Sequence, residues 1–386
     1  MTNTSFPESY QVLQTQYEQL PLLEKTILQL LSILYQPVTR MELATCLNHL
    51  GYRDNREKAW NVASIKSIIE PLLQLELLKT GSNIGITCHP QLREIPSRDA
   101  VKTGIFENLV TAVEMACPIR ESSYSSRRSF RSDSELIREV RIGIYNQDLV
   151  FIERQFEDFY HYSSTSQRIT LESVFQKMLE NPFDLEWLKS LSPELMELAL
   201  QLRLSESVQK LSTAEDELEL LKQEVLVVQR KSSSLIVLLA EQLLLRGELK
   251  ELKSFFRQIE KQNIDLHPSN FFLYQANIAC LQGHYAEAIA NYRQALTSIR
   301  KLTKKRKIYL PDIAGPLFIL SLLGEGSGDC KQEALGYVKN ALDLAISDSF
   351  NEIYILLENL LQWQQGNQSY RERLRHLCIT DPEEHS

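Results

Sequence analysis

Glycine and proline are scarce in this chain of 386 residues, which contains 13 of each. Together they make up about 7% of the sequence, whereas average proteins contain roughly 12%. This scarcity argues against collagen-like chains, linker-dominated chains and turn-rich β-sandwiches. It favours helices, because both residue types are poor helix formers.

Cysteine is also sparse, and no Cys-x-x-Cys pair occurs. The six cysteines lie far apart, at positions 46, 88, 117, 280, 330 and 378. This pattern argues against a disulfide scaffold and a zinc ribbon, which both need closely and regularly spaced cysteines. We therefore expect reduced thiols, no bound metal and a cytoplasmic protein.

Long apolar runs are missing as well. The most apolar stretch, residues 235–245, is interrupted by Glu241 and Gln242 and is much shorter than the ~20 residues that cross a bilayer. The N-terminus has neither the basic region nor the apolar region of a secretory signal. The sequence therefore predicts no membrane partner.

Positive charge is in deficit, with a formal net charge of −8. This excludes a globally basic coat for nucleic acid, although a local basic patch is still allowed. Three catalytic motifs are absent: the phosphate-binding G-x-x-x-x-G-K-[ST] loop, the G-x-S-x-G turn and the H-E-x-x-H helix. We therefore expect no enzyme, no catalytic residue, no cofactor and no small-molecule substrate.

Helical periodicity is the main pattern that is present. Residues 1–19 are polar, and we expect them to be disordered or frayed. Apolar residues then recur at spacings of three and four in three segments within residues 20–75, one of which starts with a Thr39–Glu42 capping box. Two short apolar strands follow within residues 77–87. This order is typical of a winged helix, which we predict for residues 20–95.

The function of this winged helix is open between two interpretations. Its third helix could dock on DNA, as recognition helices do. However, Lys66 is the one cation on the exposed face of that helix, beside Asn61, Ser64 and Ser67. Alternatively, the domain packs against protein or acts as a rigid spacer.

Residues 96–134 are predicted to form a connecting helix and a linker rich in serine and arginine. Serine-rich stretches such as 119–134 bury too little apolar surface to offset the entropy of ordering. Three arginines alternate there with aromatic residues, as in proteins that bind single-stranded nucleic acid. Arg127, Arg128 and Arg131, together with Lys66, are the secondary candidates for nucleic-acid contacts. A solvated linker is the alternative interpretation.

Beyond residue 134 the sequence is helical throughout and contains an internal repeat at an offset of 36 residues. A helix–turn–helix repeat needs a turn glycine followed by an aromatic residue on the second helix. Residues 272–296 resemble a tetratricopeptide repeat, and weaker copies flank it. We therefore predict an all-α protein with a tetratricopeptide-like solenoid over residues 135–386. The matched positions are Gly247 with Gly283 and Phe256 with Tyr292.

A basic segment, residues 300–307, follows the repeat. One or two cations there would complement the dipole at a helix C-terminus, and lysines can also keep a solenoid edge soluble. The alternative is a strip that binds the phosphate backbone of DNA, without sequence preference, or an acidic segment of a partner. The candidate residues are Arg300, Lys301, Lys304, Lys305, Arg306 and Lys307.

Two stretches resemble a known family. KKRKIYLPDIAGPLFIL, within residues 300–323, and RSFRSDSELIREVRIGIYNQDL, residues 128–149, are similar to segments in the N-terminal region of large bacterial Swi/Snf-type DNA helicases. In that family the region precedes an ATPase motor, whereas this sequence ends at Ser386 without motor motifs. The resemblance implies an accessory module, either the N-terminal part of a longer protein or a stand-alone relative, and it puts helicase activity in doubt.

These patterns together predict a non-enzymatic scaffold for protein–protein interaction, an accessory module of a DNA-helicase-type system. The concave face of the repeats would bind a protein partner, and the basic segment would contact DNA or an acidic segment. The alternative is a transcriptional regulator whose winged helix binds DNA while the repeats sense a partner. Salt-dependent DNA binding would separate both from a pure protein scaffold.

Overall fold

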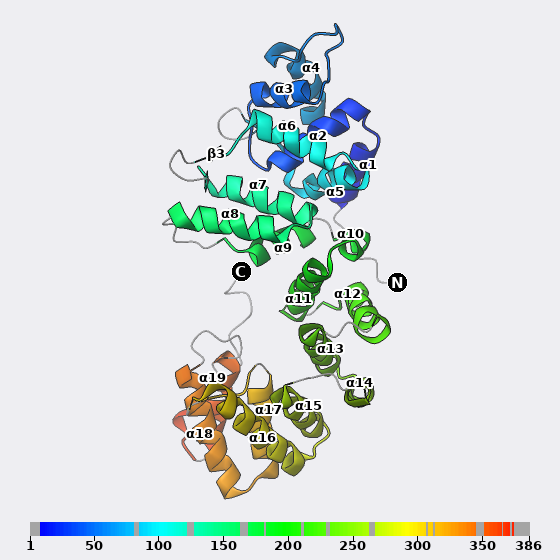
Figure 1. Cartoon of the computed structure of the whole chain (residues 1–386). Coiled ribbons are helices and arrows are strands. Elements are labelled where there is room, and N and C mark those ends of the chain that lie inside the picture. The colour runs from blue at the N-terminus through cyan, green and yellow to red at the C-terminus, as the bar shows by residue number, and fades with distance from the viewer. Residues whose placement is uncertain are drawn as a thin grey trace. The chain divides into compact units, whose positions relative to one another are not determined.

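The computed structural model describes most of the chain (Figure 1). The described residues are 8–80, 85–121, 127–162, 169–180, 183–209, 212–228, 232–261, 267–305, 308–311, 313–344, 351–364, 366–370 and 373. Helices make up 75% of the structure and strands 3%, so the protein is all-α, as the scarcity of glycine and proline predicts. Within the described ranges, every helix is too short or too polar to traverse a lipid bilayer.

Contacts divide the chain into two compact units, Met1–Glu219 (unit 1) and Leu220–Ser386 (unit 2). The boundary falls inside a helix, α12 (Glu215–Lys222). The other elements of unit 1 are α1 (Glu8–Glu18), α2 (Leu22–Leu34), α3 (Arg40–His49), α4 (Val62–Gln74), β1 (Leu78–Thr80), β2 (Ile86–Cys88), the 3₁₀ turn η1 (Pro90–Leu92), α5 (Glu94–Lys102), α6 (Phe106–Ala116), β3 (Arg120–Glu121), β4 (Arg128–Ser129), α7 (Asp133–Tyr145), α8 (Leu149–Tyr162), α9 (Leu171–Glu180), α10 (Leu185–Lys189) and α11 (Pro193–Gln209).

The N-terminal segment contains a helix where the sequence predicts a frayed end. α1 covers Glu8–Glu18, and three of its side chains, Tyr10, Leu13 and Tyr17, are buried at i, i+3 and i+7. Because this face packs against the protein, the helix is ordered despite its polar sequence. The prediction for residues 1–19 is therefore wrong for residues 8–18, while residues 1–7 lie outside the described part of the chain.

Three helices and a hairpin follow in the predicted order. α3 begins with the predicted capping box: the Glu42 amide donates to Thr39 Oγ1 at 3.2 Å, and the Thr39 amide donates to Glu42 Oε2 at 2.7 Å. β1 and β2 pair in an antiparallel ladder, and a bridge between Val38 and Ile86 ties the segment after α2 to this hairpin. The turn of the hairpin, residues 81–84, lies outside the described residues.

The predicted linker contains ordered structure. Residues 96–134 include most of α5, all of α6 and a short antiparallel ladder between β3 and β4, where the sequence suggests a single connecting helix. The Arg128 amide donates to the Asp158 carboxylate of α8 at 3.0 Å, so β4 is fixed against a neighbouring helix. The linker prediction is therefore wrong for the described part of residues 119–134, and residues 122–126 lie outside that part.

Buried charges join α7 to the N-terminal helices of unit 1. Nη2 of Arg141 lies 2.7 Å from both carboxylate oxygens of Glu94, on α5. Nη1 of Arg141 donates to the carbonyl oxygen of Ser32, on α2, at 2.8 Å, and the Tyr145 hydroxyl donates to Glu94 at 2.6 Å. These contacts tie α7 to α2 and α5. The boundary between the two units therefore lies after Glu219 and not at residue 135, where the predicted solenoid begins.

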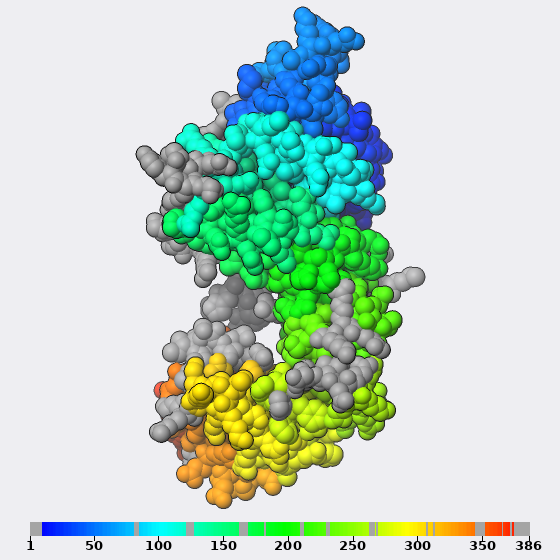
Figure 2. Space-filling view, viewed as in Figure 1, coloured from blue at the N-terminus to red at the C-terminus, as the bar shows by residue number. Residues whose placement is uncertain are grey.

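The described part of unit 2 consists of consecutive helices. Figure 2 shows α15 to α18 as one continuous block of atoms, yellow-green to orange. The elements are a π-helical turn η2 (Gln223–Val227), α13 (Ser233–Leu245), α14 (Leu249–Lys261), α15 (Pro268–Leu281), α16 (Tyr285–Thr303), α17 (Ala314–Glu325), α18 (Gly328–Leu344) and α19 (Asn351–Gln364).

The first two helix pairs, α13–α14 and α15–α16, match each other at the positions of the predicted repeat. Gly247 and Gly283 occupy the two turns with φ of +73° and +76°, a conformation that glycine adopts without strain. Phe256 and Tyr292 are buried on the second helix of each pair. The two pairs are therefore equivalent in their turns and in their buried aromatic residues.

Aromatic rings connect each pair to the next. The Phe256 ring centroid lies 5.2 Å from that of Tyr274 on α15, and the Tyr292 centroid lies 5.2 Å from that of Phe318 on α17. Phe318 in turn contacts Tyr337 of α18, with centroids 5.1 Å apart. These ring contacts link α14 to α15, α16 to α17 and α17 to α18.

Candidate functional site

The basic segment begins in the last turn of α16. Arg300 and Lys301 belong to the helix, and Lys304 ends it in a left-handed conformation, with φ of +55°. The side chains of Arg300, Lys301, Lys304 and Lys305 are exposed, and no carboxylate pairs with them in the described part of the chain. The other two candidates, Arg306 and Lys307, lie outside the described residues. Four solvent-facing cations are thus available at this helix end.

Two of the secondary candidates have carboxylate partners within unit 1. Arg128 Nη1 lies 2.6 Å from Glu139, and Arg131 Nε lies 2.9 Å from Glu135. Both carboxylates are on α7 and are buried, so these arginines hold β4 and its neighbours on the helix. Arg127 is exposed and lines a small surface hollow with acidic residues of α8. The structure therefore engages Arg128 and Arg131 in packing.

Lys66 is the cation on the exposed face of α4. Its Nζ lies 3.4 Å from Oε1 of Glu70, one turn along the helix, and both side chains are about half exposed. Because Glu70 offsets the charge of Lys66, this face has little net attraction for phosphate. Lys66 lies on α4 of unit 1, whereas the basic segment belongs to unit 2.

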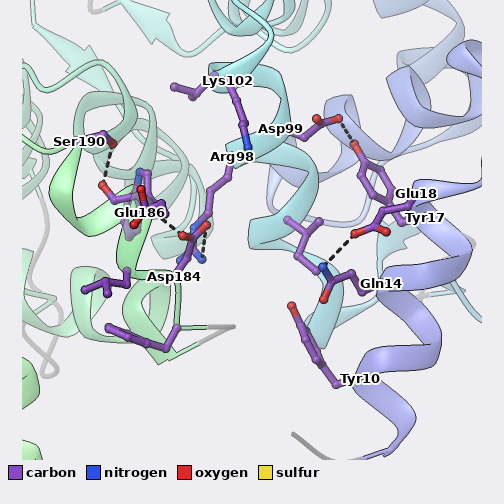
Figure 3. A pocket seen from close by; sticks show the side chains of 15 residues that line it. Tyr10, Gln14, Tyr17, Glu18, Arg98, Asp99, Lys102, Asp184, Glu186 and Ser190 are labelled. Carbon is purple, nitrogen blue, oxygen red and sulfur yellow. Dashed lines mark hydrogen bonds and ion pairs between the residues drawn. The ribbon is translucent and has the colours of Figure 1, made fainter. Parts of the chain in front are cut away.

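A cavity of about 760 Å³ lies within unit 1 (Figure 3). α1 and α5 line one part of it, and α10 with the residues leading into that helix lines the other. Arg98 and Asp99 leave α5 in different directions, toward Asp184 and Tyr17 respectively. Four lining residues are aromatic: Tyr10, Tyr17, Phe183 and Trp187.

Arg98 is held firmly on the α10 side of this cavity. Its Nη1 lies 3.8 Å from Oδ2 of Asp184, and its Nη2 donates to the carbonyl oxygen of Met178 at 2.6 Å. The guanidinium carbon lies 4.3 Å from the centroid of the Trp187 ring, within the range of a cation–π contact. The charge of Arg98 is therefore offset by Asp184 and by the face of the indole.

Two further carboxylates line the cavity on the α1 side. Asp99 Oδ2 accepts hydrogen bonds from the Tyr17 hydroxyl at 2.6 Å and from Gln29 Nε2 at 3.0 Å. Glu18 Oε1 accepts one from Gln14 Nε2 at 2.9 Å. All three donors are neutral, and neither carboxylate has a cation within ion-pair distance among the described residues. Their negative charges are therefore not neutralised.

The tyrosine hydroxyls of α1 stay protonated in this environment. Burial raises the pKa of Tyr10 above its ordinary value; Arg98 opposes this shift, while Asp184 and Glu18 add to it. Burial and the hydrogen bond to Asp99 raise the pKa of Tyr17 in the same way. Both phenols therefore offer a neutral ring and a hydroxyl group throughout the physiological pH range.

Sequence reasoning predicted none of the cavity residues. The lining comes from residues 10–18, 95–102 and 183–190, and no motif links segments so far apart. One signal was available in the first of them, because Tyr10 and Tyr17 mark an apolar helical face at i and i+7. The polar composition of residues 1–19 concealed it.

Metal binding finds no support in the described ranges. They contain no group of three or more His, Cys, Asp or Glu side chains placed to hold an ion. The five cysteines among them are all free and buried.

Comparison with known proteins adds no relative. No family model matches the chain, and neither the curated proteins nor the solved structures contain a significant match. A functional proposal therefore rests on the residues and on their geometry.

Proposed function

We propose that this protein is a non-enzymatic scaffold that binds a polyanionic partner at the basic segment. The observation that carries the proposal is the set of four exposed cations at the end of α16, which have no carboxylate partner in the described chain. One or two cations would be enough to complement the helix dipole. The excess favours attraction to phosphate groups or to an acidic protein segment.

The helix pairs of unit 2 supply the second part of the proposal. We infer that α13 to α18 form a tetratricopeptide-like solenoid whose concave face holds a protein segment. The matched turn glycines, Gly247 and Gly283, and the ring contacts between successive pairs support this assignment. Stacked hairpins of this kind create extended concave surfaces, which repeat proteins use for binding.

The N-terminal helices and hairpin form a winged-helix-like domain in this proposal. The order α2, α3, α4, β1, β2 and the bridge between Val38 and Ile86 support that assignment. Lys66, the only lysine or arginine of α4, pairs with Glu70, which favours packing against protein over docking on DNA. The alternative, a transcriptional regulator that reads DNA through α4, is therefore the weaker candidate.

The resemblance to the N-terminal region of bacterial Swi/Snf-type helicases suggests a setting for such a scaffold. A module of this type would work beside a DNA-translocating motor and would position that motor or its partners. The chain has no phosphate-binding loop of the P-loop type, so we expect the purified protein to show no ATP turnover.

Titration with a short labelled DNA duplex and with polyglutamate, at two salt concentrations, tests the proposal. The variant Lys304→Gln/Lys305→Gln removes two cations, and since each phosphate contact adds ~0.9 to the salt slope, the slope for DNA should fall by about 2. The control Lys331→Gln/Lys339→Gln removes two exposed lysines of α18 and should bind like the wild type. Exposed charges contribute little to stability, so both variants should unfold at the wild-type temperature.

The outcomes separate the parts of the proposal. Loss of both ligands in the variant, but not in the control, supports a general polyanion site, and loss of polyglutamate alone assigns the segment to an acidic protein. If wild type, variant and control bind equally, or if none binds either ligand, the basic segment is only a soluble helix end and the proposed function fails.

A further inference from the structure

The cavity of unit 1 has an excess of negative charge. Asp184 offsets Arg98, and Glu186 pairs with Lys189 at 2.9 Å. Lys102 is exposed, and Figure 3 shows it at the far end of the cavity from Tyr10. Within the described chain, Glu18 and Asp99 accept hydrogen bonds from neutral donors only, so their negative charges are not offset by an ion pair. Among the charged lining residues outside the two ion pairs, two carboxylates, Glu18 and Asp99, therefore stand against one cation, Lys102.

The aromatic lining suits a positively charged group with an apolar stem. Tyr10, Tyr17, Phe183 and Trp187 line the same cavity as these two carboxylates, and the faces of such rings attract ammonium and guanidinium groups. Arg98 already makes this contact, 4.3 Å from the centroid of the Trp187 ring, and Lys25 Nζ lies 5.7 Å from the centroid of the Tyr17 ring. A further cation entering from solvent would meet the tyrosine rings and the carboxylates of α1 and α5.

The size of the cavity indicates more than a single ammonium group. Its volume of about 760 Å³ lies within the range of roughly 300–1,000 Å³ that is typical of ligand sites. Glu18, Lys102, Glu186 and Ser190 are exposed members of the lining, so the cavity opens to solvent. A side chain can therefore enter while the backbone that carries it stays at the mouth.

We propose that this cavity binds a peptide segment of a partner protein that inserts a lysine or arginine side chain flanked by apolar residues. The cationic group lies beside Glu18 and Asp99, and its alkyl stem packs on Tyr10 and Tyr17. The flanking apolar residues contact Phe183, another member of the lining. This site belongs to unit 1 and does not depend on the polyanion site proposed for unit 2.

An array of short immobilised peptides, probed with the full chain, tests the charge preference. Each peptide has a central lysine, arginine, norleucine or glutamate within randomised apolar flanks. We expect the basic centres to retain about tenfold more protein than norleucine, which has a similar length without the charge. Glutamate centres should retain the least, because the cavity would repel them.

Two variants then test the site by calorimetry with the best peptide. Glu18→Gln/Asp99→Asn removes both charges but keeps the oxygens that accept from Gln14 and Tyr17, and it should weaken binding about tenfold or more. The control Glu107→Gln/Glu172→Gln removes two exposed carboxylates of α6 and α9, outside the cavity, and should bind like the wild type. Thermal melting of both variants checks that the fold is retained.

Three results would overturn this proposal. The first is equal retention of basic and norleucine peptides, and the second is undiminished binding by Glu18→Gln/Asp99→Asn. The third is binding of free n-butylamine as tightly as the peptide, which would assign the cavity to a small amine. None of these results bears on the DNA and polyglutamate titrations, because those test residues of unit 2.

Discussion

Neutralising Glu94 should destabilise unit 1 strongly, because Glu94→Gln leaves a charged arginine buried without a counter-ion. Glu94 and Arg141 are 3% and 2% exposed. Burial alone would lower the pKa of Arg141, but the charge of Glu94 and its hydrogen bond raise it above the ordinary value, so the guanidinium is cationic in the folded protein. Breaking a buried pair in this way costs about 3–5 kcal/mol of the free energy of unfolding. Glutamine keeps one acceptor oxygen, so we expect about 3 kcal/mol.

Replacing Glu94, Arg141 and Tyr145 together should lower the free energy of unfolding less than neutralising Glu94 alone. The triple variant Glu94→Leu/Arg141→Met/Tyr145→Phe has no buried charge and no stranded hydroxyl. It leaves only the carbonyl of Ser32, in the last turn of α2, without the donor that Arg141 supplied. One unsatisfied carbonyl costs about 1–3 kcal/mol, and replacing a buried ion pair by apolar residues is often neutral. We therefore expect a loss of about 2 kcal/mol.

Urea unfolding followed by tryptophan fluorescence measures both losses. The chain has three tryptophans, and in a Trp363→Phe background the remaining two, Trp60 and Trp187, both belong to unit 1. A loss below about 1 kcal/mol for Glu94→Gln, the size of an ordinary surface change, would refute the reasoning. A triple variant less stable than Glu94→Gln would refute it as well.

Three further predictions concern packing, thiols and turns. Phe256→Ala should cost about 3–5 kcal/mol, because its ring is 7% exposed, and a loss below about 1 kcal/mol in chemical denaturation would contradict the packing of unit 2. Burial raises the pKa of Cys46 and Cys88 from 9.0 to about 12, so mass spectrometry should find both unmodified by a thiol reagent until the protein unfolds. The same thiols ionise at a lower pH in the unfolded chain. The buried, protonated thiols therefore contribute fully to the free energy of unfolding below pH 9.0, and this contribution is lost as the pH rises toward 12. Gly247→Ala should destabilise the protein by about 1 kcal/mol, since the φ of Gly247 is +73°. Gly336→Ala should instead stabilise it by about 0.5–1 kcal/mol, because Gly336 lies inside α18 with open space around it. Melting-temperature shifts of the same sign for the two variants would contradict this prediction.

Local features of the fold were predictable because the residues that cause them lie within one or two helical turns. The Thr39–Glu42 capping box and the turn glycines at 247 and 283 depend only on short spacings, and the structure has them where the sequence predicts. The exposure of Arg300 to Lys305 follows from the same kind of evidence, since a run of cations is rarely buried. The interaction of this segment with a partner stays a prediction.

Features that depend on distant residues were not predictable. Arg128 and Arg131 read as solvent-facing cations in a serine-rich stretch, and nothing in the sequence selects Glu139 and Glu135 as their partners. The division of the chain follows from pairs such as Arg141 with Glu94, which are separated by 47 positions. The cavity of unit 1 combines three remote segments, so its lining appears only after the helices have packed.

The contact between α7 and the C-terminal end of α2 sets an order on folding during translation. Ser32 leaves the ribosome long before Arg141, which follows it by 109 positions. Until α7 emerges, the Glu94 carboxylate lacks its counter-ion and the Ser32 carbonyl at the end of α2 lacks its hydrogen-bond donor. The surface of the first helices and hairpin that packs against α7 therefore stays exposed. A nascent chain stalled before α7 should therefore expose an unfinished surface to chaperones, and a gene fragment encoding only residues 20–95 should yield a poorly folded product.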